Sequence, residues 1–547
     1  MTDHDVIIIG SGLAGGILGS ILARNGAKVV LVDGTQHPRF AVGESTIPHL
    51  LVRLHILAQR YNVPEIAHLQ DIKTITRSIG TTMGVKRHFG FQLHRDGEEP
   101  DPRESVQAAT PKTLYRASHL FRQDTDAYLF RVALAYGCQA RQNWRVADVD
   151  FDDDGVTVTG QNGEQLRGRY LVDASGFRSV LADKFSLREE PSRLRHHSRS
   201  LFTHMVGVTP YDDVVDTPAK YKPPVPWHEG TMHHTFERGW FWVIPFNNHK
   251  QSTNDVVSVG LTFDQRLYPK PAGKSPEEDF REHVARFPAV ARQFQGAKSI
   301  REWVSTGRLN YSSNRSVGPR WCLMSHAAGF VDPLWSRGMS NTVEVIDALA
   351  WRLLEALDDN DFSEERFEYI ERLEQGLLDY NDDLVNSSLI SFSHFPLWDA
   401  VFRIWGFSSN YGAMRLSRAE LGYQLTGDDQ VFKDLENNPH PGFWWPDEPE
   451  MKTIWDRMVE VCLKCEAGDM TPQAAADTLH TMLRRSQLPP TALGYKDPDN
   501  QWVNPSVLDL AKFMAWGITR GPGTVKELTG GLLRASFRQG IRRQKVV

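Results

Sequence analysis

Three glycines near the N-terminus constrain the fold most. Gly10, Gly12 and Gly15 form a Gly-x-Gly-x-x-Gly sequence between an apolar strand pattern at 5–10 and a helical pattern at 11–27. The first glycine permits a tight turn, the second lets the backbone approach a ligand, and the third lets the helix pack against the strand. A helix that begins this way offers free N–H groups and a positive dipole to a phosphate. The stretch therefore predicts the start of a dinucleotide-binding domain.

A second strand pattern at 28–34 completes a βαβ unit and places Asp33 where a carboxylate accepts hydrogen bonds from a ribose. An Asp-Pro-x-x-Ser-x-Gly element at 332–338 precedes a long helical pattern, and no second Gly-x-Gly-x-x-Gly sequence is present. Two elements that bracket one nucleotide favour the extended cofactor FAD over a bound NADPH. The residues expected to contact it here are Gly10, Gly12, Leu13, Ala14, Gly15 and Asp33.

Hydrophobic periodicity divides the rest of the chain into three kinds of segment. Strand patterns around Asp-Gly and Asn-Gly turns occupy 145–176, and further strand patterns dominate 190–310. Helical patterns prevail from about 343 onward. The predicted fold class is α/β, with a Rossmann-like FAD-binding domain, an antiparallel β-sheet substrate module and a helical C-terminal region.

The same patterns suggest a core at 1–360 and a helical region at 361–547 that covers the substrate site. The core is expected to be discontinuous in sequence. Its Rossmann-like part is assigned to about 1–80, 117–185 and 300–360, and its β-sheet module to about 81–116 and 186–299.

Composition argues against several classes of partner. The formal net charge is -6 and no block of basic residues is present, so nucleic acid is not an expected partner. No run approaches the ~20 apolar residues of a transmembrane segment, and no basic segment precedes the first strand, as a secretory signal would require. We therefore expect a cytoplasmic protein.

Cysteine and histidine spacing gives no reason to expect a metal. Cys462 and Cys465 form one Cys-x-x-Cys pair in a helical pattern, without a second pair to complete a zinc site. Four cysteines in 547 residues are too few for a disulfide framework, so reduced thiols are expected. The five histidines at 196, 197, 228, 233 and 234 match no closed metal site.

The stretch GWFWVIP at 239–245 predicts a strand that is buried on both faces. Side chains alternate along a strand, so Trp240 and Trp242 point one way while Phe241 and Val243 point the other. Both sets are apolar. The proline that ends the stretch lacks an N–H and marks where the strand leaves the sheet.

Several stretches together resemble the flavin-dependent halogenases. They are GSGLAGG, the GES at 43–45, GVKRHFGF at 84–91, GWFWVIP and FVDPLWSRG at 330–338. The resemblance runs from about residue 5 to beyond 520 and weakens after about 410. It implies that O2 and chloride form hypochlorous acid at reduced FAD (FADH2), and that this oxidant passes through a tunnel to chlorinate an electron-rich aromatic or heteroaromatic molecule in secondary metabolism. Pyrrole, phenylpyrrole, indole and phenol-like rings are the expected substrates.

The resemblance also implies a separate NAD(P)H-dependent flavin reductase that supplies FADH2. The resemblance does not decide whether the substrate is free or tethered to a carrier protein. It also leaves open whether the enzyme is a monomer or a homodimer. A flavin-dependent monooxygenase or oxidase on the same scaffold is the alternative activity, and a non-catalytic flavin-binding subunit is the alternative from another class.

By the same resemblance, Lys86 matches the lysine that receives or directs the oxidant. Burial would lower the pKa of this lysine and leave its amine nucleophilic; the alternative is a surface lysine beside Arg87. Trp240 and Trp242 match an aromatic wall between flavin and tunnel.

Further positions follow from the resemblance alone. Ser336, Arg337 and Gly338 match a loop whose backbone N–H groups hold chloride. The other implied cofactor contacts are Arg39, Glu44, Ser45, Arg122, Asp173, Gly338 and Met339.

Two departures from the family pattern matter. Trp335 stands where the tryptophan halogenases have a glutamate that works with the lysine, so the acid/base partner of Lys86 is open. The candidates for that role are Glu44, Glu229 and Asp332. Ser325 and His326 replace a usual Gly-Asp pair that contacts the ribityl chain, so we expect looser FAD binding.

Overall fold

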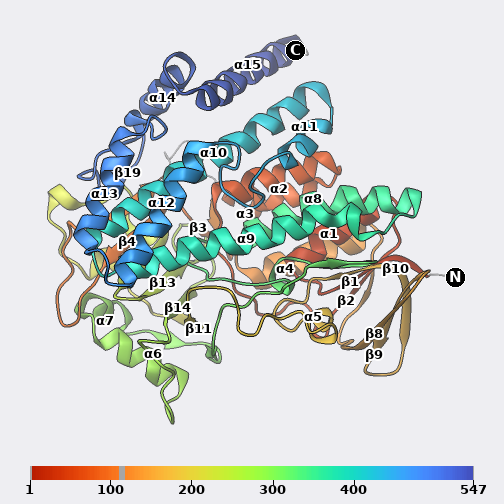
Figure 1. Cartoon of the computed structure of the whole chain (residues 1–547). Helices are drawn as coiled ribbons and strands as arrows, with labels where there is room; N and C mark the ends of the chain where they lie inside the picture. Colours follow the sequence, from red (N-terminus) through yellow and green to blue (C-terminus); the bar gives the residue numbers. More distant parts are fainter. Residues whose placement is uncertain (1–2, 110–116, 546–547) are drawn as a thin grey trace.

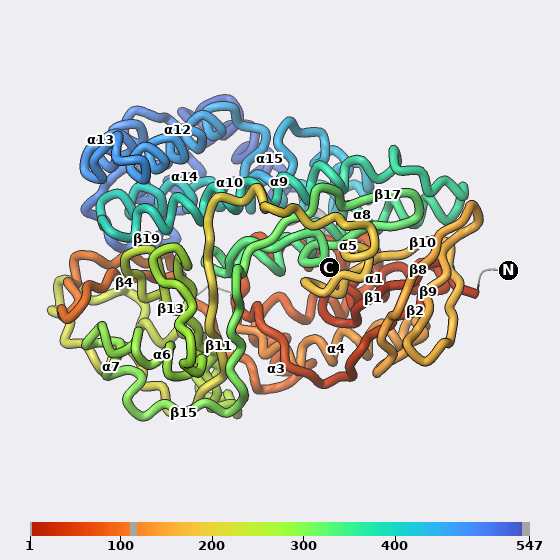
Figure 2. Tube along the Cα trace, turned by 60° about the horizontal axis from the view of Figure 1, so that its bottom comes forward, coloured from red at the N-terminus to blue at the C-terminus, as the bar shows by residue number. Residues whose placement is uncertain are grey.

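Two β-sheets lie side by side beneath a layer of long helices in the computed structural model, which describes residues 3–109 and 117–545 (Figure 1). The stretch 110–116, assigned to the β-sheet module from the sequence, lies outside the described residues. A view turned by 60° shows the later helices as one layer along both sheets (Figure 2).

The first sheet is built around the predicted βαβ unit. Its strand order is β17-β18-β10-β1-β2-β7, with β8 and β9 forming a hairpin beside β10. The strands are β1 (His4–Ile9), β2 (Val29–Val32), β7 (Gln139–Arg141), β8 (Val146–Asp152), β9 (Gly155–Gly160), β10 (Gln165–Asp173), β17 (Val317–Gly318) and β18 (Trp321–Leu323). From β18 to β7 the neighbours are parallel. Parallel strands are covered on both faces, which is why β2 is apolar at every position.

The second sheet is mostly antiparallel, as the sequence predicts, and its order is β15-β11-β14-β13-β12-β4-β5-β19, with β16 beside β11. Its strands are β4 (His88–Leu93), β5 (Ser105–Ala109), β11 (Ser198–Val206), β12 (Thr231–Phe236), β13 (Gly239–Pro245), β14 (Val257–Asp264), β15 (Lys298–Ser299), β16 (Val304–Ser305) and β19 (Trp502–Val503). Two pairs, β12 with β4 and β19 with β5, are parallel. Strand β19 is a short exception within the C-terminal region, which is helical in the main, as the sequence predicts.

Strand β13 confirms the two-faced burial expected of GWFWVIP. Every one of its residues is buried. Trp240 and Trp242 belong to the main core beneath the helices, whereas Phe241 and Val243 belong to a separate cluster. Helices α6 (Pro276–Ala285) and α7 (Pro288–Phe294) supply part of that second cluster. The strand ends at its proline, also as predicted.

Helices make up most of the remainder. Those of the first half are α1 (Leu13–Arg24), α2 (Pro48–Arg60), α3 (Ile72–Ser78), α4 (Arg122–Ala135) and α5 (Val180–Lys184). Those of the second half are α8 (Gly338–Asp359), α9 (Glu364–Ser391), α10 (Phe395–Thr426), α11 (Gln430–Lys433), α12 (Pro449–Glu466), α13 (Pro472–Arg485), α14 (Val507–Thr519) and α15 (Gly523–Lys545). A small sheet pairs β3 (Gly84–Val85) with β6 (Ser118–His119). No helix in the described ranges has the length and apolarity needed to span a membrane.

Candidate active site

The glycine turn between β1 and α1 has the geometry that the sequence predicts. Gly10 has φ +101°, and a Cβ at Gly15 would lie 1.9 Å from the Gly10 carbonyl oxygen, so only glycine lets α1 begin this close to β1. At Gly12 a Cβ would be 3.4 Å from Asp126 Oδ2, an ordinary contact. No side chain caps the first turn of α1, which leaves its N–H groups open to a phosphate.

Asp33 lies at the end of β2 beside this turn. Its carboxylate accepts hydrogen bonds from the N–H and hydroxyl of both Ser11 and Thr35, and from Arg39 Nη2 at 2.7 Å. Burial alone would raise the pKa of Asp33, but the Arg39 charge and these hydrogen bonds outweigh it and hold the pKa below its ordinary value. The Asp33 carboxylate is therefore an anionic acceptor. A ribose hydroxyl would donate to it beside the Ser11 hydroxyl.

Two arginines bring positive charge to the same place. The Arg39 guanidinium lies beside Gly12, 3.6 Å from the position of a Cβ there. Arg122 pairs with Asp126 and donates to the carbonyl oxygens of Val42 and Gly43. An uncapped helix terminus flanked by guanidinium groups fits the pyrophosphate of FAD, and Arg39 and Arg122 would help to hold it.

Asp173 and Glu44 are both buried and both have partners within the protein. Asp173 is fully buried, and its carboxylate accepts hydrogen bonds from Ser175, Ser179 and the Leu181 N–H. It therefore shapes the loop after β10, and its role as a cofactor contact stays a prediction. Glu44 is also buried, and its Oε1 lies 2.7 Å from His204 Nε2.

The loop expected to hold chloride needs a partial correction. The Ser336 N–H donates to the Pro333 carbonyl at 3.0 Å, so this N–H is not free for an anion. The Arg337 side chain lies over the Trp444 ring at 4.1 Å, turned toward the helical layer. The open donors are instead the first N–H groups of α8, at Gly338 and Met339, because no side chain caps this helix.

His326 packs against the start of α8. A Cβ at Gly338 would lie 2.9 Å from His326 Nε2, so a larger residue there would require the imidazole to move. Burial lowers the pKa of His326 to about 4, which keeps the imidazole neutral at physiological pH. The neighbouring Ser325 hydroxyl lies 2.7 Å from Thr342 Oγ1 on α8. The Ser325–His326 pair is thus part of the support for this helix terminus.

Lys86 follows β3 and is buried, with only 5% of its surface exposed. Its Nζ donates to Ser45 Oγ at 2.7 Å and to the Thr46 carbonyl at 2.8 Å, and lies 4.5 Å from the Phe89 ring centroid. Burial lowers the pKa of Lys86 well below its ordinary value. No carboxylate of the described ranges lies within 4.0 Å of this amine to oppose that effect. The surface-lysine alternative is therefore wrong.

The carboxylates considered as partners of Lys86 are held elsewhere. Glu229 pairs with Arg87, and Glu44 with His204. Asp332 accepts the Leu334 N–H at 3.0 Å, and burial raises its pKa to about 6. The structure brings none of the three to the amine.

Trp335 occupies the position of the missing glutamate. It is fully buried, and its ring centroid lies 4.3 Å from that of Trp405 on α10. Its Nε1 donates to Ser388 Oγ at 3.2 Å. An aromatic cluster thus replaces the carboxylate beneath the wall of the cavity described next.

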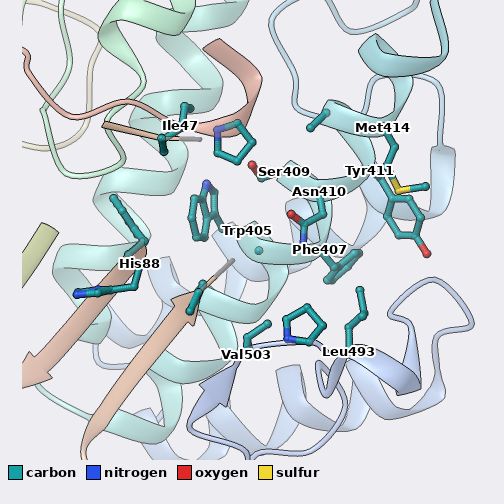
Figure 3. A pocket seen from close by; sticks show the side chains of 18 of the residues that line it. Ile47, His88, Trp405, Phe407, Ser409, Asn410, Tyr411, Met414, Leu493 and Val503 are labelled. Carbon is teal, nitrogen blue, oxygen red and sulfur yellow. The ribbon is translucent and has the colours of Figure 1, made fainter. Parts of the chain in front are cut away.

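Lys86 and Phe89 line a cavity of about 410 Å³. Figure 3 shows Trp405, Asn410 and Tyr411 of α10 along it, with Leu493 and Val503 of the C-terminal segment facing them (Figure 3). Its lining also includes Ile47, Val52, Ala109, Phe407, Met414 and Phe513. A cavity of this size and largely apolar lining suits a small organic ligand.

Trp240 and Trp242 lie outside the lining of this cavity. Their ring centroids are 5.5 Å apart. Trp240 also packs near the His233 ring and Trp242 near the Phe202 ring. They form a continuous buried aromatic layer, and their role as a wall beside the flavin stays a prediction.

Three of the five histidines named from the sequence, His196, His233 and His234, have separate hydrogen-bond partners. His196 Nδ1 lies 2.5 Å from an Asp382 oxygen, His233 bonds the Gly90 carbonyl and His234 bonds Gln293. Within the described part of the chain, no group of three or more His, Cys, Asp or Glu side chains could hold a metal. All four cysteines are unpaired.

The fold and the nucleotide site define an FAD-binding oxidoreductase, and the FAD binding domain family model matches residues 3–365. Tetracycline 7-halogenase of Kitasatospora aureofaciens is 54% identical over 525 residues, which are 96% of this chain and 94% of that protein. The monodechloroaminopyrrolnitrin halogenase PrnC of Pseudomonas fluorescens is 44% identical over 531 residues, 96% of this chain and 93% of that one.

A solved structure, that of halogenase PltM in complex with phloroglucinol and FAD, has a TM-score of 0.89 at 34% identity and covers 92% of this chain and 100% of its own. The chain belongs to the flavin-dependent halogenases. The sequence resemblance is thereby confirmed, and FAD and chloride are the cofactor and halide of this enzyme family.

Proposed function

We propose that this enzyme chlorinates an electron-rich, phenol-like ring of a fused-ring aromatic molecule, and that Lys86 delivers the chlorine. One observation carries the proposal: the buried Lys86, which pairs with no carboxylate of the residues that the structure describes, lines an aromatic cavity. Burial lowers the pKa of such an amine, which favours its neutral, nucleophilic form.

Reduced FAD, when bound, would supply hypochlorous acid from O2 and chloride. The glycine turn, Arg39 and Arg122 would hold the dinucleotide, and the N–H groups of Gly338 and Met339 would hold chloride at the start of α8. Trp240 and Trp242 would keep the substrate away from the flavin. A separate NAD(P)H-dependent reductase would regenerate FADH2.

The lysine step balances without a further reagent. The Lys86 lone pair attacks the chlorine of hypochlorous acid, so that an N–Cl bond forms, the Cl–O bond breaks and water leaves with one amine proton. A ring carbon of the substrate then attacks the same chlorine. The C–Cl bond forms, the N–Cl bond breaks, and the amine regains the proton that the ring loses.

The size and lining of the cavity support the choice of substrate class. A volume of about 410 Å³ accommodates more than one ring, and Trp405, Phe407 and Phe513 offer flat faces for stacking. The similarity to tetracycline 7-halogenase points toward a fused-ring phenol. Such rings are electron-rich, which favours attack on an electrophilic chlorine.

The test combines the purified protein with a flavin reductase, NADH, FAD and chloride. Its substrates are tetracycline-type phenols, single-ring phenols, pyrroles, indoles and a carrier-bound pyrrole, and chlorinated products are identified by their isotope pattern. We expect a fused-ring phenol to be chlorinated. Lys86→Met should abolish product while FAD affinity persists, and Lys250→Met, at an exposed lysine, should match the wild type. Oxygen insertion that does not depend on chloride would overturn the proposal, and preference for the carrier-bound pyrrole would overturn its substrate class.

A further inference from the structure

A buried chain of hydrogen bonds runs from Lys86 to the end of β13. Lys86 Nζ lies 2.7 Å from Ser45 Oγ, Ser45 Oγ lies 2.9 Å from Thr231 Oγ1, and Thr231 Oγ1 lies 3.0 Å from His119 Nε2. His119 Nδ1 lies 2.9 Å from the Pro245 carbonyl oxygen. The four side chains are at most 6% exposed, so water does not compete for these bonds.

The direction of each bond is fixed by the groups at the ends of the chain. The Pro245 carbonyl can only accept, so the proton of a neutral His119 is on Nδ1 and Nε2 is an acceptor. Thr231 must then donate its hydroxyl proton to Nε2 and accept from Ser45. Because Ser45 donates its hydroxyl proton to Thr231, its oxygen can only accept a hydrogen bond from Lys86.

Burial keeps this direction fixed. It lowers the pKa of His119 to about 3, although the hydrogen bond to the Pro245 carbonyl acts in the opposite sense. The imidazole therefore stays neutral, and Nε2 stays an acceptor. A neutral histidine that accepts at one nitrogen and donates at the other defines the orientation of everything bonded to it.

The backbone around Ser45 makes the arrangement rigid. Thr46 is joined to Ser118 by three hydrogen bonds: its N–H and its hydroxyl donate to the Ser118 carbonyl, and the Ser118 N–H donates to its Oγ1. The Thr46 carbonyl accepts a second N–H of Lys86 at 2.8 Å. Both acceptors of the amine thus belong to a strand-like segment that is tied to β6.

We infer that Ser45, Thr231 and His119 are positioning residues that orient the Lys86 amine for chlorine transfer. Two N–H bonds of the neutral amine are directed to Ser45 and to the Thr46 carbonyl, which leaves its lone pair in the one remaining direction for the incoming chlorine. The uncharged side chains of Ser45, Thr231 and His119 thus orient the Lys86 amine, a role that a neighbouring carboxylate would otherwise have. The inference rests on the proposed role of Lys86.

The inference revises the sequence interpretation of Ser45. That interpretation placed Ser45 among the cofactor contacts because it belongs to the GES stretch. In the structure its hydroxyl has Lys86 and Thr231 as partners, which come 41 and 186 residues later in the chain.

Thr231→Val tests the chain because valine keeps the shape of threonine and removes only the hydroxyl. With the link broken, we expect kcat for chlorination to fall about 10- to 100-fold, the loss typical of a misoriented reacting group, with KM and FAD affinity unchanged. Thr231→Ser restores the hydroxyl and should recover most of the rate. Thr235→Val removes a buried threonine hydroxyl from the same strand, outside the chain, and should retain the wild-type kcat.

Lys86→Met separates the two proposals. If Lys86→Met chlorinates, the proposed function fails; if Lys86→Met is inactive and Thr231→Val keeps the wild-type kcat, only the positioning inference fails. Equal losses in Thr231→Val and Thr235→Val would also overturn it, because the effect would then be one of packing. Should Thr231→Val not fold, Ser45→Ala interrupts the same chain one link closer to the amine and carries the same expectation.

Discussion

The side-chain amide of Asn248 holds the main chain of Val85 from both sides. Asn248 Oδ1 accepts the Val85 N–H at 2.8 Å, and Asn248 Nδ2 donates to the Val85 carbonyl at 2.8 Å. Val85 precedes Lys86, and Asn248 follows the strand that carries Trp240 and Trp242. The lysine and the tryptophan strand are therefore fixed relative to each other by two hydrogen bonds.

Replacing Asn248 with alanine should misplace Lys86. Each Val85 group left without a partner costs about 1–3 kcal/mol of stability, and a small displacement of the amine should lower kcat about 10- to 100-fold. Chlorination kinetics and thermal unfolding measure the two effects. Asn247→Ala, at the exposed neighbouring position, is the control and should change neither. A fully active Asn248→Ala would contradict the positioning role.

Gly12→Ala should weaken FAD binding without harming the fold. A Cβ at Gly12 has ordinary room within the protein, but it would stand where the pyrophosphate approaches the backbone. We expect the Kd for FAD, measured by flavin fluorescence, to rise at least about tenfold, the equivalent of one lost hydrogen bond to a charged group. Gly80→Ala, where a Cβ would meet no atom within 4 Å, serves as control. Unchanged affinity in Gly12→Ala would mean that the dinucleotide binds elsewhere.

Trp335→Glu restores the family's glutamate and should nevertheless inactivate the enzyme. The position is fully buried between aromatic rings, so the change both removes a large apolar side chain, worth about 3–5 kcal/mol, and buries a carboxylate. We expect a much lower midpoint of urea unfolding for Trp335→Glu and a small change for Trp335→Phe. A stable and active Trp335→Glu would show that a carboxylate can assist Lys86 here.

The low pKa of Lys86 predicts a pH-dependent difference in stability between the wild type and Lys86→Met. The unfolded chain has the ordinary lysine pKa of about 10.4, whereas burial lowers the folded-state pKa. Between those two values the unfolded state binds the extra proton, so the unfolding free energy of the wild type rises by about 1.4 kcal/mol per pH unit relative to Lys86→Met.

Urea unfolding of both proteins at about pH 9 and about pH 10, within that window, measures this slope. The unfolding free energy of the wild type should increase relative to that of Lys86→Met as the pH rises. Lys250→Met, at an exposed lysine, should show no such shift. Parallel stability curves for the wild type and Lys86→Met would mean that the folded protein keeps Lys86 charged.

Features with a local cause could be predicted from the sequence. The turn at Gly10 and Gly15 follows from steric limits within a few residues, and the opposite faces of Trp240 and Phe241 follow from the two-residue period of a strand. The burial of Lys86 came from the family resemblance, because the residues beside it are equally compatible with a surface position.

Features that depend on distant segments could not be predicted. Ser45, Lys86, His119 and Thr231 come from four separate parts of the chain, and nothing near any one of them indicates the other three. Strand β19 escaped prediction because two residues carry no periodic signal, and its strand character depends on the neighbour β5. The engagement of the Ser336 N–H could not be predicted either, because the turn that bonds it to the Pro333 carbonyl depends on the local backbone geometry.

The C-terminal segment that contains β19 completes the second sheet, because β19 pairs with β5. Without Trp502–Val503, β5 would be an edge strand of its sheet. Its unpaired N–H and C=O groups would then lie beside the cavity that Lys86 lines. During synthesis on the ribosome this edge is closed nearly 400 residues after β5 emerges. The cavity beside Lys86 thus gains this part of its lining only after residue 503 has been made.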